Sequence, residues 1–497
     1  MPAEDEKKTY IYPKLDQNIE YLRRELGIDL CFDILLREFM IGQKRALFLF
    51  LDGFANSSEI IHIMKSLFVA KREEIVPHTM QKIVTLFLPY GEVSTVDNLE
   101  EAVQQFLSGP LIFFMDGEKE ALIIDIRQYP ARGPEEPDIE KITRGSRDGF
   151  VETLLFNATL IRRRVRDPKL RTEIFKIGKR SLSEVALVYI EDIANPHILE
   201  IIKDRFAAID IDGLPMAEKS VEEFITNTRW NPFPNVRYTE RPDVAAAHLF
   251  EGHICIIVDT SPSVIIAPVT LFHHIQHAEE FRHNAIVGAY IRLVRLLGVF
   301  LSVFLIPLWL LLAEHQSMLP DFLKFIGPKE AAHVPLFVQF IMANIGLDLI
   351  RLASIHTPSP LATALGLVGA LLIGDIAVKV GFFAPEILLY ISIVAIGVFS
   401  TPSWELGLAN RLTNLFLLIL TGLFKLPGFL AGLLILLIYL GRTRSFGVPY
   451  LYPLIPFNWH SLMDVLFRKP LPLRDMRPSF LQPKDADIKE IEDQGNK

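Results

Sequence analysis

Long apolar runs between residues 289 and 439 are the feature that most limits what this chain can fold into. The clearest of them, residues 296–313, reads LLGVFLSVFLIPLWLLLA and contains no charged side chain. An α-helix needs about 20 mainly apolar residues to cross about 30 Å of hydrocarbon, and this run approaches that length. The sequence therefore predicts a membrane domain, with the more polar part of the chain attached upstream.

Four further apolar segments follow, and each contains polar residues or breaks. They cover residues 335–350, 360–380, 385–404 and 410–439. Lys425, Pro427 and Gly428 interrupt the last segment, which predicts two short helices in place of one long helix. Together with residues 296–313, these segments give about six crossings. The predicted architecture is an all-α polytopic bundle over residues 296–442.

Polar and charged side chains within these segments are the first candidate functional residues. An ionised side chain at the centre of a membrane helix costs on the order of 2.5–3.5 kcal/mol on insertion scales, so such groups are expected to face protein or water. The pore or intramembrane candidates are Asn344, Asp348, Arg351, Asp375 and Lys379. Arg351, Lys379 and also Glu386 lie near segment ends, where they can instead reach the membrane interface.

Asp348 and Arg351 are three residues apart, so a helix would place them on one face, where they can pair. Asn344 lies one turn earlier and extends a polar stripe along an apolar helix. In a ring of identical subunits, such a stripe would repeat around a water-filled pathway. A structural ion pair at the membrane boundary explains the same residues, and the sequence leaves both interpretations open.

Lysine and arginine flank the apolar segments unevenly. With six crossings, most of the flanking arginines fall on one side, whereas Lys324, Lys329 and Lys425 fall on the other. Because cationic loops stay preferentially in the cytoplasm, both termini are predicted to be cytoplasmic. The N-terminal residues MPAEDEKK lack the basic and apolar regions of a secretory signal, which agrees with this orientation.

The part of the chain before residue 273 alternates between strand and helix patterns. Residues 45–51 form a continuous apolar run, typical of a strand buried on both faces. Residues 110–115 and 121–127 predict a β-hairpin, because an Asp-Gly turn lies between them. Helices are expected at residues 18–26, 28–39, 56–68, 98–107 and 147–166. The predicted class for this part is α/β.

The α/β pattern also repeats along the chain. Residues 187–195 resemble residues 48–56, and both stretches end in Ala-Asn. A later glycine and aspartate, Gly252 and Asp259, repeat the spacing of an earlier pair in the hairpin region. These similarities predict two tandem α/β cytoplasmic subdomains, copies of one fold. Convergent β-α patterning is the alternative, because the identity between the copies is weak.

The expected organisation has six parts in chain order. They are a mobile tail with a short helix (1–27), a first α/β subdomain with its linker (28–137), a second α/β subdomain (138–272), a coupling amphipathic helix (273–295), the transmembrane domain (296–442) and a cytoplasmic C-terminal tail (443–497). The helix at residues 273–295 is expected to carry rearrangements of the subdomains to the first crossing, because it joins the two directly.

Composition and motifs exclude several functions. The net charge of −8 has no basic excess, which argues against nucleic acid as a partner. The sequence contains no GxxxxGK[ST] phosphate loop and no GxSxG nucleophile elbow, so we predict a protein that is not an enzyme and needs no cofactor. Cys31 and Cys255 are flanked by apolar residues and are expected to be buried thiols.

Two further clusters have ordinary explanations beside functional ones. Four histidines, His273, His274, His277 and His283, invite a metal site, but they lack the HExxH arrangement, and a solvated helix is favoured. Residues 162–180 are rich in arginine and lysine. They can bind anionic headgroups or form salt bridges with another subunit, and the sequence does not decide between these.

Several motifs, in order along the chain, resemble the A subunits of GerA-type spore germination receptors. They include RGSRDGF at residues 144–150, YTERPD at residues 238–243, LFEGHICIIVD at residues 249–259 and SFGVPY at residues 445–450. The signature residues are Thr239, Glu240, Arg241, Pro242, Asp243, Gly252, Asp259, Pro262, Ser445, Phe446, Gly447, Pro449 and Tyr450. The resemblance extends from about residue 44 to residue 456.

This resemblance implies a multi-pass protein of the spore inner membrane, with its termini on the core side. It implies a subunit of an oligomeric ion channel or germination complex that contributes to ion release during germination. The implied partners are identical subunits, a polytopic B-type germination subunit or another small spore membrane protein, and the lipid bilayer. A secondary transporter or a non-conducting structural scaffold is the alternative. The stretch from Asp348 to Pro358 carries fewer charges than is usual in the family, which leaves its ion preference open.

Overall fold

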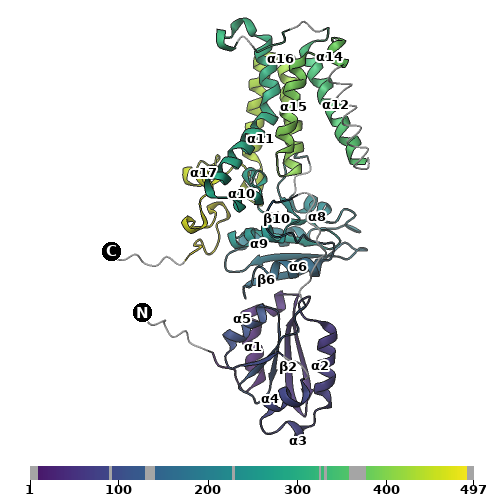
Figure 1. The fold of residues 1–497 in the computed structure, drawn as a ribbon, viewed down its shortest axis with the longest axis vertical. Coiled ribbons are helices and arrows are strands. Elements are labelled where there is room, and N and C mark those ends of the chain that lie inside the picture. Colours follow the sequence, from purple (N-terminus) through teal and green to yellow (C-terminus); the bar gives the residue numbers. More distant parts are fainter. Residues whose placement is uncertain are drawn as a thin grey trace, which may run out of the picture. The chain divides into compact units, whose positions relative to one another are not determined.

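The computed structural model describes residues 9–88, 92–128, 140–226, 230–323, 326–329, 333–356 and 376–489. These residues form two compact units, each with its own core (Figure 1). The α/β unit contains the described residues up to 226, residues 238–268 and the C-terminal residues from 474 onward. The helical unit contains residues 230–237 and the described residues between 269 and 473.

The α/β unit contains two five-stranded sheets with the same strand order. The first subdomain contains α1 (Leu15–Leu26), β1 (Ile34–Ile41), β2 (Lys44–Leu51), α2 (Ser57–Val69), α3 (Arg72–Ile75), α4 (Thr79–Lys82), β3 (Val93–Val96), α5 (Leu99–Leu107), β4 (Leu111–Met115) and β5 (Ala121–Ile124). Its sheet has the order β1-β2-β4-β5-β3, and neighbouring strands are antiparallel.

The second subdomain follows the same plan. It contains α6 (Leu154–Arg162), β6 (Leu170–Ile177), β7 (Ser183–Ile190), α7 (Pro196–Ala207), α8 (Ala217–Thr226), β8 (Arg237–Thr239), α9 (Pro242–Glu251), β9 (Ile254–Val258) and β10 (Val264–Ala267). The sheet order is β6-β7-β9-β10-β8, which repeats the first sheet strand for strand.

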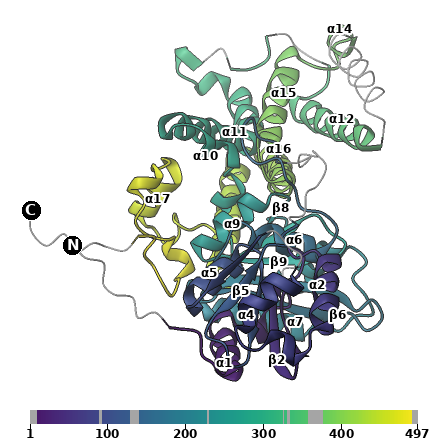
Figure 2. The same cartoon turned by 60° about the horizontal axis from the view of Figure 1, so that its bottom comes forward.

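The continuous apolar run in β2 is explained by helices on both faces of the first sheet. Leu47 and Leu49 pack into the core that contains α1 and α5, whereas Ala46 and Phe48 pack into the core that contains α2. Figures 1 and 2 show α1 and α2 on opposite sides of β2. Because successive side chains of a strand point to opposite faces, both sets must be apolar.

Side-chain contacts repeat between the two subdomains. The Asn18 side chain bonds to both backbone groups of Tyr12, and the Asn157 side chain bonds to both backbone groups of Val151. Asp116 and Asp259 form a second equivalent pair of contacts. Their carboxylates accept the backbone N–H of the first residue of α1 and of α6, respectively, each at 3.1 Å. Equivalent side-chain contacts therefore fix equivalent turns and helix starts in the two subdomains.

The subdomains meet at a buried charged cluster. Arg162 Nε lies 2.5 Å from Asp33 Oδ2, and the Thr172 hydroxyl donates to Asp33 Oδ1 at 2.6 Å. The side chains of Arg162 and Asp33 are only 1% and 2% exposed. A buried pair of this kind specifies geometry more than it adds stability, because both charges lose their hydration. The pair thus fixes how the two copies join.

Three expectations for the α/β unit were wrong. The predicted helix at residues 28–39 is a short 3-10 turn followed by β1, because β1 pairs along its whole length with β2. The helix predicted within a mobile tail, α1, is instead part of the first core, where Leu22 and Leu26 are fully buried. The helix expected over 147–166 is limited to α6. The expected linker at residues 130–137 lies outside the described residues.

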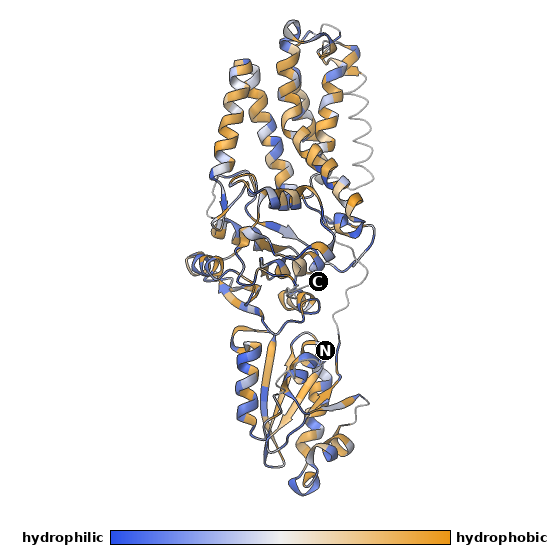
Figure 3. Ribbon diagram, turned by 90° about the vertical axis from the view of Figure 1, so that its left-hand side faces the viewer, coloured by the Kyte–Doolittle hydropathy of each residue, from blue (hydrophilic) through white to orange (hydrophobic). Residues whose placement is uncertain are grey.

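The helical unit contains the apolar helices. Its elements are a 3-10 turn η3 (Leu271–His274), α10 (Ala278–Arg282), α11 (Ala285–Glu314), α12 (Leu336–His356), α14 (Ala377–Lys379), α15 (Pro385–Phe399), α16 (Trp404–Arg442), β11 (Arg444–Ser445), β12 (Val448–Pro449) and α17 (Trp459–Leu466). By length and composition, α11, α12 and α16 can each cross a membrane. In the ribbon of Figure 3, the long helices are coloured mainly as hydrophobic residues.

The helix α16 reverses direction at Lys425, as its sequence predicts. Lys425 has a non-helical backbone (φ 54°, ψ −135°), and Pro427 follows it. A Cβ at Gly428 would lie 2.0 Å from the carbonyl oxygen of Leu420, so the two halves of the helix touch closely beside the reversal. Leu406 and Leu440, from opposite ends of α16, share one core cluster. The two halves are therefore antiparallel.

The expected single helix over residues 273–295 is wrong. This stretch is divided into η3, α10 and the first turns of α11. The break has a local cause, because the His277 side chain accepts the backbone N–H of Glu279 and so starts α10 as an N-cap. Most of the third expected crossing, which includes Asp375, lies outside the described residues.

Candidate functional site

A charged cluster between α12 and α16 is the strongest candidate site in the helical unit. Asp348 Oδ1, on α12, lies 2.5 Å from Arg411 Nε, on α16. Arg411 also donates to the backbone carbonyl of Asn344 at 2.8 Å. Arg411 is seven residues inside α16, which at 1.5 Å per residue places it about 10 Å from the helix start. The pair thus lies about two turns into α16, near the start of its apolar segment at residues 410–439.

Arg351 occupies a separate position near this pair. Its guanidinium lies 3.9 Å from the centre of the Trp404 ring and 5.9 Å from the Phe399 ring. A cation over an aromatic face is stabilised electrostatically, and Trp is the best partner for it. Of the sequence candidates, Asn344, Asp348 and Arg351 lie on the same part of α12, and the structure adds Arg411, an arginine at the start of an apolar segment.

The two ends of the ion pair differ in exposure. The Arg411 side chain is 10% exposed, whereas the Asp348 side chain is 46% exposed. The open side of this carboxylate needs water or protein against it, because an ionised group facing hydrocarbon is strongly disfavoured. Within the part of the chain that the structure describes, the carboxylate side of the site is therefore open. Arg411 could have been found from sequence as a cation at the start of the apolar segment 410–439.

Of the other intramembrane candidates, Lys379 and Glu386 lie on helices other than α12 and α16. Lys379 ends the short helix α14, and Asp375 lies outside the described residues. Glu386, in the first turn of α15, accepts the backbone N–H of Lys329 at 3.3 Å. An acidic side chain in a first helical turn interacts favourably with the helix dipole. Glu386 therefore has a structural explanation in its own helix start.

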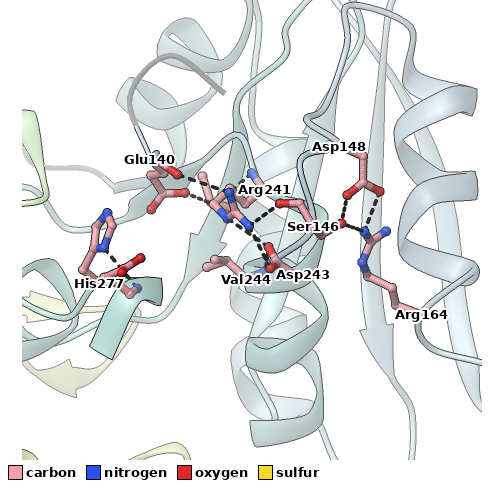
Figure 4. Close-up of polar contacts among 10 residues, drawn as sticks. Glu140, Ser146, Asp148, Arg164, Arg241, Asp243, Val244 and His277 are labelled. Carbon is pink, nitrogen blue, oxygen red and sulfur yellow. Dashed lines mark hydrogen bonds and ion pairs between the residues drawn. The ribbon is translucent and has the colours of Figure 1, made fainter. Parts of the chain in front are cut away.

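The signature residues of the second subdomain form a buried arginine cluster. Arg241 is fully buried, and its guanidinium donates to the carbonyls of Glu140 and Ser146 and to the Asp243 carboxylate (Figure 4). The Thr239 hydroxyl donates to the Glu140 carboxylate at 2.5 Å. These bonds hold residues 140–148 against the start of α9. Their role is to fix a segment with no regular secondary structure.

The remaining signature residues in this subdomain fix backbone turns. Gly252 ends α9 with φ 100°, a left-handed conformation that favours glycine. The Glu240 carbonyl accepts the N–H of Phe150 at 2.8 Å, and Pro242 is the first residue of α9, where a missing N–H costs nothing. Asp259 holds the start of α6, and Pro262 lies in the turn between β9 and β10.

A second signature cluster lies at the base of the helical unit. The Ser445 hydroxyl donates to the Asn235 carbonyl at 2.7 Å and accepts the Val269 N–H at 3.1 Å. Phe446 and Gly447, with φ 49° and 90°, form the turn between β11 and β12, and Pro449 pairs with Arg444. Ser445 therefore ties together three segments that are distant in sequence.

Tyr450 completes this cluster. It is fully buried beside Phe233 and His274, with ring centres 6.4 Å and 6.2 Å away. Burial and the nearby positive charge of Arg237 lower the pKa of His274 to about 3. Burial raises the pKa of the Tyr450 hydroxyl. Both rings are therefore neutral near pH 7 and act as packing groups.

The histidine and arginine clusters noted in the sequence are divided among separate contacts. His277 caps α10, and His283 lies 3.1 Å from Glu279. In the basic stretch, Arg162 pairs with Asp33, while Arg164 pairs with Asp148 and Arg171 with Glu191. These three arginines form ion pairs within the chain. Cys31 and Cys255 are buried free thiols, as expected.

Comparison with known proteins identifies the family. Residues 20–480 match the family described as Bacillus/Clostridium GerA spore germination protein. Stage V sporulation protein AF of Bacillus subtilis (strain 168) is 46% identical over 98% of each chain. Spore germination protein KA of the same organism is 30% identical over 97% of this chain and 89% of its own. These relatives are named as sporulation and germination proteins, not as enzymes.

Similar proteins occur in other species. Spore germination protein GerLA of Bacillus cereus is 30% identical over 94% of this chain and 96% of its own. The crystal structure of the N-terminal domain of the A subunit of the Bacillus megaterium spore germinant receptor GerK3 matches 53% of this chain and 97% of its own, with 28% identity and a TM-score of 0.42. With a family match over nearly its whole length, the chain belongs to the GerA family of spore germination proteins.

Proposed function

We propose that this chain is a subunit of an ion-conducting complex in the spore inner membrane that contributes to ion release during germination. Family membership supports a role in germination, and the apolar helices α11, α12 and α16 support a membrane location. In this proposal the α/β subdomains and both termini lie on the core side. A polytopic B-type subunit or another small spore membrane protein is the proposed partner.

The half-open ion pair between Asp348 and Arg411 is the observation that carries the proposal. Among the described residues, its cation is covered, with 10% of the Arg411 side chain exposed, whereas 46% of the Asp348 side chain is exposed. A neighbouring copy of α12 or a water-filled pathway would satisfy the open side. A ring of identical chains would bring one such carboxylate from each subunit to the same depth, which is how many cation-selective pores are lined.

Ion flux through liposomes containing the purified full-length chain tests this proposal. Asp348→Asn preserves the shape of the side chain and removes its charge, so we expect an assembled complex with changed conductance or cation selectivity. Glu314→Gln is the matched control, because Glu314 lies at the end of α11, where its carboxylate is 3.9 Å from Lys425. The control should conduct like the original chain.

Three results would contradict the proposal. Saturable exchange in place of passive flux would indicate a secondary transporter. A well-assembled complex without flux would indicate a structural scaffold. If Asp348→Asn prevented assembly but left permeation unchanged in the surviving fraction, the ion pair would hold the helices together and would not line a pathway.

A further inference from the structure

The C-terminal residues 474–489, here named the C-terminal latch, belong to the α/β unit although the whole helical region precedes them in sequence. They dock on the second subdomain. Arg474 lies 2.7 Å from Glu251, and Arg477 donates to the Phe250 carbonyl at 2.9 Å. Both partners are in the last turn of α9. Leu481, in the middle of the latch, is fully buried.

The latch also bonds to the turn between β7 and α7. The backbone N–H of Lys484 donates to the Ile193 carbonyl at 3.0 Å, and the Asn195 side chain donates to the Leu481 carbonyl at 3.0 Å. A Cβ at Gly252 would lie 3.5 Å from Pro483, which is ordinary contact. The latch is thus held by hydrogen bonds to backbone carbonyls, one ion pair and one buried apolar side chain.

The first subdomain fills the same position with a different piece of chain. Phe54 corresponds to Ile193, and its carbonyl accepts the N–H of Gln128 at 2.7 Å. Gly109 corresponds to Gly252, and a Cβ there would lie 3.3 Å from Arg127. Arg127 and Gln128 follow directly after β5. In the first copy, the covering segment is therefore local.

In the second copy, the chain after β10 continues into the helical unit and is not available for this role. The position is occupied by the latch, which arrives more than 200 residues later in sequence. The correspondence covers one backbone acceptor and one glycine contact in each copy. The latch therefore replaces a structural part of the fold and is not a loosely attached tail.

We propose that the second α/β subdomain contains a docking groove for an extended segment, occupied by residues 474–489 of the same chain. This latch attaches the helical region to the subdomain at both of its ends, through the peptide bonds at 268–269 and 473–474. A displacement of the last helices would then act directly on the turn between β7 and α7. The inference concerns docking, and it does not depend on ion conduction.

Limited trypsin digestion of the full-length chain in detergent tests the docking. The latch contains Lys484, and the bond between Lys484 and Asp485 is a cleavage site that is protected when the latch is docked. Leu481→Asp places a charge in an apolar site, so we expect cleavage after Lys484 to rise about tenfold or more. Ile488→Asp is the matched control, because Ile488 lies in the same segment and is 40% exposed. Its cleavage should match that of the original chain.

Exchange of the charges at Arg474 and Glu251 provides a second test. It compares two single variants with the double variant, so a general folding defect would not be mistaken for loss of docking. Arg474→Glu and Glu251→Arg should each speed cleavage of the latch, and the double variant should restore protection. Restoration is expected only if the two side chains meet. Equal cleavage of Leu481→Asp and Ile488→Asp, or no restoration in the double variant, would overturn the proposal.

Discussion

The two α/β subdomains share a strand order and a set of backbone-fixing contacts, yet they differ in what surrounds them. The first covers the ends of its inner strands β2 and β4 with Arg127 and Gln128, and the buried cluster of Thr239 and Arg241 lies outside it. The second carries Thr239, Arg241 and Gly252 and borrows its covering segment from the C-terminus. What repeats between the copies stabilises the fold, whereas the contacts found only in the second copy hold two added segments, residues 140–148 and the C-terminal latch.

The junction between the copies gives the largest expected effect. Asp33→Ala leaves the Arg162 charge buried without its partner, so we expect the free energy of unfolding of the α/β unit to fall by about 3–5 kcal/mol. The double variant Asp33→Leu with Arg162→Met should recover most of this loss. Denaturant unfolding of the full-length chain, monitored by hydrogen exchange in β1 and β6, measures the loss in Asp33→Ala and the recovery in the double variant.

Asp29→Ala is the control for the junction, because the Asp29 and Arg23 side chains are 73% and 47% exposed. An exposed ion pair contributes about 1 kcal/mol or less. If Asp33→Ala destabilised the chain no more than this control, the buried pair would not fix the join between the copies.

The stability of the segment around His274, which follows the second subdomain in the chain, should depend on pH. The unfolded His274 side chain binds a proton below about pH 6.5, whereas the folded one, with its pKa lowered to about 3, does not. The unfolded state therefore binds more protons, and stability falls as the pH drops from 6.5 toward 3, by up to about 1.4 kcal/mol per pH unit. Thermal unfolding at pH 7.5 and pH 5.5 measures this loss.

Replacement of the histidine separates this effect from general acid denaturation. His274→Phe keeps the packing against Tyr450 but cannot titrate, so its melting temperature should fall less between the two pH values. His62→Phe, at an exposed position of the first subdomain, should respond to acid like the original chain. Identical responses of all three proteins would assign the acid sensitivity to other groups.

The smallest expected effect compares two equivalent helix caps. Asn56 caps α2, and Asn195 caps α7. Asn56→Ala should cost about 1 kcal/mol, whereas Asn195→Ala also loses the bond to the latch and should cost about 1 kcal/mol more. Hydrogen exchange at the first turns of α2 and α7 measures both. In a chain that ends at residue 473 the two costs should become equal, and a persistent difference would contradict the role given to the latch.

Much of the fold could be predicted from the sequence because its signals are local. The apolar run in α11, the break at Lys425 and the hairpin of β4 and β5 each depend on residues close together in the chain. The helix expected at residues 28–39 failed for the opposite reason. Its β conformation depends on pairing with β2, and tertiary pairing overrides local periodicity.

The sequence by itself determined that this chain joins two α/β copies to apolar helices and carries the family's signature residues, because apolar patterns and motifs are written in neighbouring residues. Only the tertiary structure decided that Asp348 meets Arg411, that Asp33 meets Arg162, and that the latch covers the second subdomain. These contacts join residues separated by 63, 129 and 291 positions. Partner choice at such separations follows from packing of the whole chain, which no local pattern specifies.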